Sequence, residues 1–136
     1  LNSLQTSDDA CEAKTNIFLN ALMRRRLKEL VKVYTKDVVL SWGPFKFRGP
    51  TKITRWAREL YELFPILDFE EKSSTIHGSV VRKELVISFV MAAGHVGKLP
   101  CVATFEFDNE RIQRIGIEVQ DGILLFKKEA SNIKDW

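Results

Sequence analysis

Residues 37–65 read DVVLSWGPFKFRGPTKITRWARELYELFP and predict a strand, a turn and a helix in that order. The strand begins near Val38 and is interrupted at Gly43, because a β-favouring run meets a Gly-Pro pair there. Gly49 suits the position before a helix, and Pro50 suits its first turn. The apolar residues that follow recur at helical spacing: Ile53, Trp56, Ala57, Leu60, Tyr61 and Phe64. Pro65 then predicts the end of an amphipathic helix.

Two more helices are predicted before this stretch. Ser7, followed by two aspartates, provides a capping hydroxyl and negative charge for a helix that runs to about Met23. A second helix is predicted over residues 27–34, since its apolar residues also keep helical spacing: Leu27, Leu30, Val31 and Tyr34. Between them lies Arg24-Arg25-Arg26. Three adjacent charges point in different directions around a helix, which favours a solvated helix junction over a phosphate or partner contact.

The second half of the chain predicts consecutive strands. Residues 67–77 form a weakly patterned strand, which suggests a place near the sheet edge. Residues 80–92 alternate most strongly and are apolar on both faces, with Val86, Val90 and Ala92 on the outer one. An exposed apolar face is costly in water, so we expect a homodimer through the outer sheet face. Two further strands follow around a turn at 108–110, and Ile112 is out of phase with the last strand, which suggests a bulge.

Length and composition predict one soluble globular domain over residues 1–126, followed by a polar tail over residues 127–136. Hydrophobic residues make up 45% and charged residues 29%, which is ordinary for that class. Cys11 and Cys101 have neither metal-ligand nor redox spacing and indicate reduced thiols, and no segment has the pattern of a signal peptide or a membrane span. The expected location is therefore the cytoplasm. A net charge of +3 is too mild to indicate nucleic acid.

The order of these elements predicts an α+β fold in which a curved antiparallel sheet wraps around three N-terminal helices and forms a cone. The run LKELVKVYTKDVVLSW at 27–42, the FRG at 47–49 that opens a helix closing on LFP at 63–65, and the DNERI hairpin at 108–112 together resemble the SnoaL-like members of the nuclear-transport-factor-2-like (cystatin-like α+β) superfamily. The resemblance spans roughly residues 17–126. It implies the fold but no single activity, because the superfamily includes isomerases, dehydratases, cyclases, epoxide hydrolases and non-enzymatic binders.

The resemblance also says where catalytic groups would lie. Ketosteroid isomerases of this fold use a tyrosine and two aspartates, and the matching positions here are Phe18, Trp42 and Ala103. Since all three are apolar, isomerase chemistry of that design is excluded. Limonene-epoxide hydrolases place an arginine and an aspartate where this chain has Leu85 and Ile87, so that set is incomplete too.

Three candidate catalytic residues remain. Scytalone dehydratase, which resembles this fold, works with a pair of histidines, and the two histidines of this chain are His77 and His95. Both lie beside glycines, which favours ordinary turn residues over catalytic ones. The acid/base aspartate of SnoaL-like cyclases has its nearest equivalents in Asp121 and Glu118. The strand phase of Glu118 points away from the cone and favours a role on the dimer surface. The candidates are therefore Asp121, Glu118 and His77.

An apolar, aromatic-rich pocket is expected between the helices and the concave sheet. Its predicted lining residues are Phe18, Tyr34, Trp42, Phe45, Trp56, Phe89, Met91, Cys101 and Phe105. Cys101 lies between apolar residues and is expected to be an inert thiol rather than a nucleophile. No metal or cofactor is expected.

These observations support two main functional hypotheses. The first is a protein that binds a small apolar or aromatic molecule. Whether it also has a weak isomerase, cyclase or dehydratase activity through the three candidate residues is left open. The alternative is a non-catalytic homodimeric protein-interaction module. A third hypothesis, RNA contact through Arg24–Arg26, is disfavoured by the mild net charge.

Overall fold

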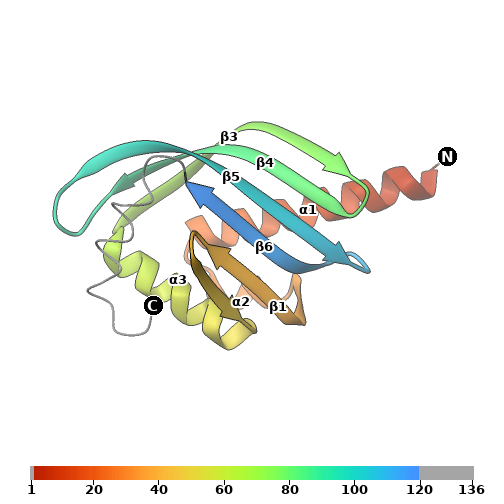
Figure 1. The fold of residues 1–136 in the computed structure, drawn as a ribbon, viewed down its shortest axis with the longest axis horizontal. Coiled ribbons are helices and arrows are strands. Elements are labelled where there is room, and N and C mark those ends of the chain that lie inside the picture. Colours follow the sequence, from red (N-terminus) through yellow and green to blue (C-terminus); the bar gives the residue numbers. More distant parts are fainter. Residues whose placement is uncertain (1, 120–136) are drawn as a thin grey trace.

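The computed structural model describes residues 2–119, with side chains from residue 8 onward. Its elements are α1 (Asn2–Met23), α2 (Leu27–Leu30), β1 (Tyr34–Trp42), β2 (Phe45–Arg48), α3 (Pro50–Leu63), β3 (Ile66–His77), β4 (Val80–Val90), β5 (Val96–Asp108) and β6 (Arg111–Val119) (Figure 1). Asp121, the end of the expected domain at residue 126 and the expected tail at 127–136 lie outside the described residues.

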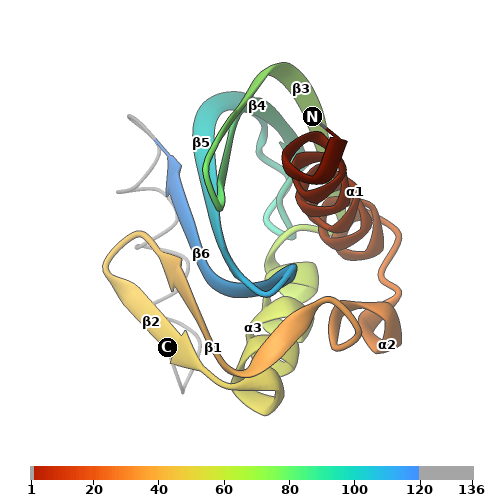
Figure 2. The ribbon, with the colours of Figure 1, turned by 90° about the vertical axis from the view of Figure 1, so that its right-hand side faces the viewer.

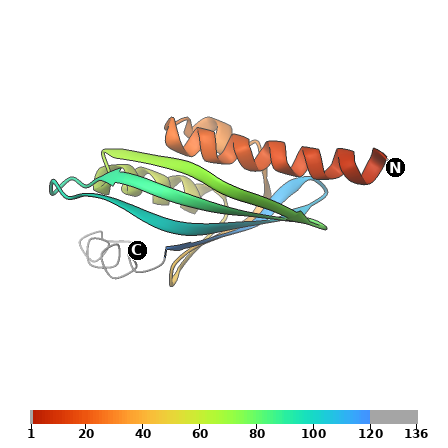
Figure 3. The same ribbon diagram turned by 90° about the horizontal axis from the view of Figure 1, so that it is seen from above.

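The six strands form one sheet in the order β2-β1-β6-β5-β4-β3. All neighbouring strands are antiparallel except β1 and β6, which run parallel. The sheet is strongly curved, and α1 and α3 lie on its concave side (Figure 2). Seen from above, α1 runs along the length of the sheet as a separate layer (Figure 3). The predicted α+β cone is confirmed.

The core fills the space between the helices and the concave face. Strand alternation turns Leu85, Ile87 and Phe89 of β4 inward, and each is at most 4% exposed. The apolar side of α3 meets them from the helix layer, with Ile53, Trp56, Ala57 and Leu60 fully buried. The amphipathic helix predicted from residues 50–64 is therefore confirmed, with Gly49 as its N-cap residue at a φ of 86°.

The second predicted helix is wrong beyond its first turn. It ends at Leu30, Val31 is 45% exposed, and Tyr34 is buried as the first residue of β1. The apolar spacing of 27–34 fitted a helix, but the segment from Val33 onward is rich in β-favouring residues. Tyr34 pairs with Ile112 in the parallel ladder of β1 and β6, so tertiary pairing overrides the local helical pattern.

Two predictions about the strands are confirmed. β3 lies at the sheet edge as predicted. The bulge expected near Ile112 is also present, because the pairing of β5 with β6 moves from Glu106–Arg114 to Phe107–Ile112 and leaves Gln113 without an opposite residue. No helix within residues 2–119 is both long and apolar enough to cross a membrane.

Arg25 ties the helix junction to the far end of α3. Its guanidinium donates hydrogen bonds to the carbonyl oxygens of Phe64 (3.3 Å) and Pro65 (2.5 Å) and lies 4.6 Å from the ring centroid of Tyr61. Tyr61 in turn donates its hydroxyl to the carbonyl oxygen of Leu22 (2.6 Å). The middle residue of the arginine triplet therefore packs the end of α1 against α3.

Candidate functional site

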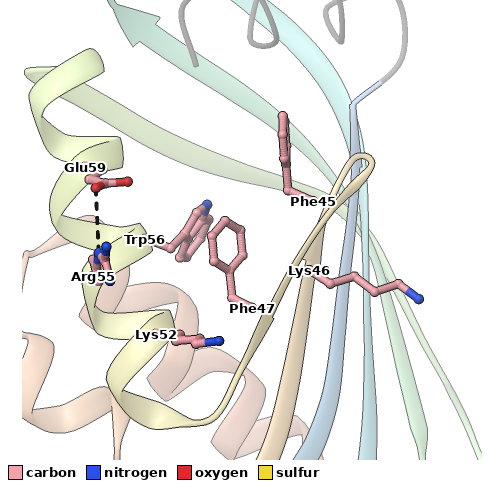
Figure 4. A pocket seen from close by; sticks show the side chains of 7 residues that line it. All are labelled: Phe45, Lys46, Phe47, Lys52, Arg55, Trp56 and Glu59. Carbon is pink, nitrogen blue, oxygen red and sulfur yellow. Dashed lines mark ion pairs between the residues drawn. The ribbon is translucent and has the colours of Figure 1, made fainter. Parts of the chain in front are cut away.

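A pocket of about 280 Å³ lies between β2 and α3, and we call it the β2–α3 pocket. Its lining residues are Phe45, Lys46, Phe47, Lys52, Arg55, Trp56 and Glu59 (Figure 4). Strand alternation puts Phe45 and Phe47 on the α3 side of β2 and sends the Lys46 side chain the opposite way. Helical spacing brings residues 52, 55, 56 and 59 to the side of α3 that faces the strand. The result is an aromatic pocket with a charged rim.

Trp56 is the central side chain of this pocket and is fully buried. Its ring centroid lies 5.7 Å from that of Trp42 and 6.2 Å from that of Phe47. Its indole nitrogen lies at the end of the ring away from Lys52 (Figure 4) and has no hydrogen-bond partner among the described residues. A buried N–H without an acceptor is unfavourable. The N–H of Trp56 is therefore a donor without an acceptor in the part of the chain that the structure describes, and it belongs to a side chain in the wall of the pocket.

The rim carries both signs of charge. Nε of Arg55 lies 4.0 Å from Oε1 of Glu59, whose side chain is only 18% exposed. Lys52 has no ion-pair partner among the described residues. Glu59 is the carboxylate among the residues that line this pocket. Its nearness to Trp56 follows from the i, i+3 spacing of the two residues.

Two of the nine predicted lining residues, Phe45 and Trp56, border the β2–α3 pocket. Cys101 borders a different hollow between β4 and β5. The other six are packed in the hydrophobic core and at most 4% exposed: Phe18, Tyr34, Trp42, Phe89, Met91 and Phe105. Among them, Phe18 meets Phe105 edge to face at 5.6 Å.

Tyr34 is a second buried donor without a partner. Its hydroxyl has none among the described residues, its ring lies 6.4 Å from that of Phe18, and burial raises the pKa of the phenol. The hydroxyls of Tyr34 and Thr35 and the indole nitrogen of Trp56 are the three buried side-chain polar atoms without a partner among the described residues.

The candidate acid/base residues are placed apart from the pocket. Glu118 is exposed on the outer face of β6, opposite Val102, and His77 is exposed at the end of β3, opposite Val80. Strands β4 and β5 separate β3 from β6, so the structure does not bring these two residues together. Asp121 lies outside the described residues.

The positions that the family resemblance matched to catalytic groups are all in the core. They are Phe18, Trp42, Leu85, Ile87 and Ala103, each at most 4% exposed. Within residues 8–119, no group of three His, Cys, Asp or Glu side chains is arranged to hold a metal ion.

Sequence reasoning missed a polar cluster around Lys83, a fully buried side chain on β4. Its Nζ lies 3.1 Å from Oε1 of Glu12, 2.5 Å from Oε1 of Glu71 and 3.1 Å from Oγ of Ser74. The signal was present in the sequence, because Lys83 is in phase with the inward-facing Val81 and Leu85. An ammonium held by three oxygens is a poor nucleophile, so this cluster joins α1, β3 and β4 rather than forming a reactive site.

Comparison with known proteins identifies the family of this architecture. Residues 17–115 match the family model described as a SnoaL-like domain. No protein with a curated description matches the chain.

Solved structures share the fold at low sequence identity. An NTF2-like protein of unknown function from Burkholderia pseudomallei K96243 is 12% identical, with a TM-score of 0.80, covering 86% of this chain and 95% of that one. An LEH-like epoxide hydrolase from M. tuberculosis is 17% identical, with a TM-score of 0.73, covering 93% and 97%. TerC, co-crystallised with polyporic acid, is 10% identical, with a TM-score of 0.78, covering 87% and 96%.

Proposed function

This chain belongs to the SnoaL-like domain family, and we propose that it binds a small aromatic molecule in the β2–α3 pocket. The observation that carries the proposal is Trp56, a buried indole beside Phe45 and Phe47 whose N–H has no acceptor within the described part of the chain. An aromatic ligand with one acceptor oxygen would stack against these rings and accept that hydrogen bond. TerC, which shares this fold, was co-crystallised with polyporic acid, and this supports a small-molecule ligand for this chain.

We propose ligand binding rather than strong acid/base catalysis. The positions matched to catalytic groups in ketosteroid isomerases and epoxide hydrolases are apolar and buried here. Glu118 and His77 are exposed and lie outside the β2–α3 lining, so a weak isomerase, cyclase or dehydratase activity would require Asp121 or one of these residues to reach the ligand. A cytoplasmic location belongs to the same proposal and is supported by two free cysteines, Cys11 and Cys101.

The alternative is a homodimeric interaction module that uses the outer sheet face. Val86 and Val90 lie on that face of β4 and are half-buried, while Ala92 follows the strand and is exposed. A second copy covering them would remove apolar surface from water. A mass measurement in solution that finds only monomers at micromolar concentration would rule out the dimer.

Native mass spectrometry on freshly purified protein tests ligand binding and subunit number together. We expect a dimer that carries an extra mass of roughly a few hundred daltons per subunit, as a drug-sized ligand would. A ligand-free dimer would favour the interaction module.

A binding assay with 2-naphthol then locates the site. We expect Phe45→Ala to weaken binding on the order of tenfold, because an aromatic wall of the pocket is lost. Phe69→Ala is the matched control, since Phe69 is also half-buried but lies on β3 away from the pocket. Equal losses in the two variants would contradict the assignment of the site.

A further inference from the structure

The outer face of the sheet carries a second, chemically different pocket of about 260 Å³, which we call the outer-face pocket. Strands β1, β2, β5 and β6 supply its lining: Val39, Ser41, Lys46, Arg48, Glu106, Arg114, Ile115 and Gly116. It lies on the opposite side of β2 from the aromatic pocket, since the Lys46 side chain points away from Phe47 and Trp56 (Figure 4).

Strand register arranges these residues in two neighbouring rows. In the first, Val39 of β1 pairs with Arg48 on one side and Arg114 on the other. In the second, Ser41 pairs with Lys46 and Gly116 in the same way. Because adjacent strands are about 4.8 Å apart, the β2 cations and Arg114 stand roughly 10 Å apart at their bases. Side chains as long as lysine and arginine can converge on one small group from that separation.

Val39 forms the apolar part of the floor between Arg48 and Arg114, and the part of the floor beside it is low and polar. Gly116 has no side chain, and a Cβ atom built on it would meet nothing within 4 Å. Ser41 beside it carries a hydroxyl that can donate a hydrogen bond. The floor therefore leaves space above β1 and β6 for a ligand of a few heavy atoms.

The charge of the outer-face pocket is unbalanced. Among the described residues, none of Lys46, Arg48 and Arg114 forms an ion pair. Glu106 is the carboxylate in the lining and lies opposite Arg114 in the β5–β6 register. Elsewhere on the same face, Arg82 is neutralised by Glu84 at 3.0 Å. Three cations against one carboxylate make this pocket attractive to an anion.

We propose that the outer-face pocket binds a phosphate group, either as inorganic phosphate or as a phosphate monoester. Guanidinium groups match the oxygens of phosphate in geometry and charge, and lysine and serine add single donors. Lys46 borders both hollows, but its side chain points away from Phe47 and Trp56 (Figure 4), and the other residues that carry this inference do not line the β2–α3 pocket, so the inference does not depend on that pocket.

Amide NMR on the intact chain tests the proposal. Inorganic phosphate and ribose 5-phosphate are titrated separately at constant ionic strength, with sodium chloride as the control salt. We expect saturable shifts of the Ser41 and Gly116 amides with at least one phosphate compound and none with chloride. If both compounds saturate alike, the site recognises the phosphate itself, whereas saturation by ribose 5-phosphate alone assigns it to monoesters.

Two arginine variants distinguish a site from general surface charge. Arg114→Gln is expected to weaken phosphate binding on the order of fivefold, as the loss of one partly exposed charge-assisted contact would. Arg82→Gln removes an arginine from the same face and is expected to leave binding unchanged. The proposal is overturned if neither compound saturates, if chloride reproduces the shifts, or if both variants weaken binding equally.

Discussion

The ammonium of Lys83 on β4 lies 3.1 Å from a carboxylate oxygen of Glu12 on α1, and this contact joins the long helix to the concave face of the sheet. Glu71 and Ser74 of β3 contact the same ammonium, so one fully buried side chain connects three elements. Both carboxylates remain partly hydrated, with side chains 31% (Glu12) and 47% (Glu71) exposed. The cluster therefore has a buried cation at its centre and solvent at its edge.

Removing the cation should cost far more than removing one of its partners. We expect Lys83→Ala to lower the free energy of unfolding by about 2–3 kcal/mol, because the stem leaves a cavity and two carboxylates lose their shared cation. Glu71→Gln should cost less than about 1 kcal/mol, since that carboxylate is half exposed and Glu12 still pairs with the lysine. Urea denaturation measures both, and equal losses would contradict this description of the cluster.

Much of the fold was predictable from particular residues. The helix predicted at 50–64 and observed as Pro50–Leu63 has two independent local signals that agree, a Gly-Pro start and an uninterrupted apolar side. The strand predicted at 80–92 and observed as Val80–Val90 has one strong signal, because it alternates over its whole length. The helix predicted from Leu27 to Tyr34 was wrong beyond its first turn, although the spacing of its apolar residues fitted a helix. Tyr34 instead pairs with Ile112, and this pairing depends on a strand far along the chain.

The sites were less predictable, for a physical reason. Trp56 and Phe45 were expected to line a pocket, but the approach of α3 to β2 decides which side chains border the space and which fill the core. Lys83 could be identified as inward-facing from its strand phase, whereas its partners Glu12 and Glu71 are 71 and 12 residues away and meet it only in the folded chain.

Two tyrosine-to-phenylalanine changes should differ in their effect on the free energy of unfolding. Tyr61 donates its hydroxyl to the carbonyl oxygen of Leu22, so Tyr61→Phe is expected to lower the free energy of unfolding by about 1 kcal/mol. The buried hydroxyl of Tyr34 has no described partner, so Tyr34→Phe should leave stability unchanged or raise it by about 0.5 kcal/mol. Thermal unfolding compares the two, and a larger loss from Tyr34→Phe would mean that its hydroxyl is satisfied in solution.

Two glycines provide a matched test of packing. A Cβ atom at Gly97 would lie 2.8 Å from the Phe89 ring, which itself packs edge to face on Phe64 at 5.5 Å. We expect Gly97→Ala to destabilise the protein by about 1–2 kcal/mol, since that ring must shift within the core. Gly116→Ala meets open space and should change stability by less than about 0.5 kcal/mol. Chemical denaturation measures the free energy of unfolding of both variants. A larger loss from Gly116→Ala than from Gly97→Ala would contradict this packing.

The cysteines should be unreactive in the native state. Burial raises the pKa of the Cys101 thiol to about 12, and burial, reinforced by Glu110, also raises the pKa of Cys11. At pH 8 we therefore expect negligible reaction with a disulfide reagent until urea unfolds the chain, after which both thiols react. Rapid native labelling of Cys101 would contradict its burial.

The same shift has a consequence for stability. An unfolded Cys101 loses its proton near its ordinary pKa of 9.0, whereas the folded thiol keeps its proton up to about 12. Its contribution to stability is therefore fully present below pH 9 and is lost as the pH rises toward 12. The pKa of Tyr61, raised to about 12 by burial despite the opposing charge of Arg25, acts in the same direction above pH 10.

The most direct test of the proposed aromatic site is the indole ¹⁵N–¹H spectrum of the full chain during a titration with 2-naphthol. The chain has three tryptophans, and Trp56→Phe identifies the signal of the buried indole. We predict that the Trp56 signal moves downfield and saturates, because its N–H, which has no acceptor among residues 8–119, gains one. A Trp56 signal that stays in place at saturating 2-naphthol would contradict the binding of aromatic molecules in the β2–α3 pocket.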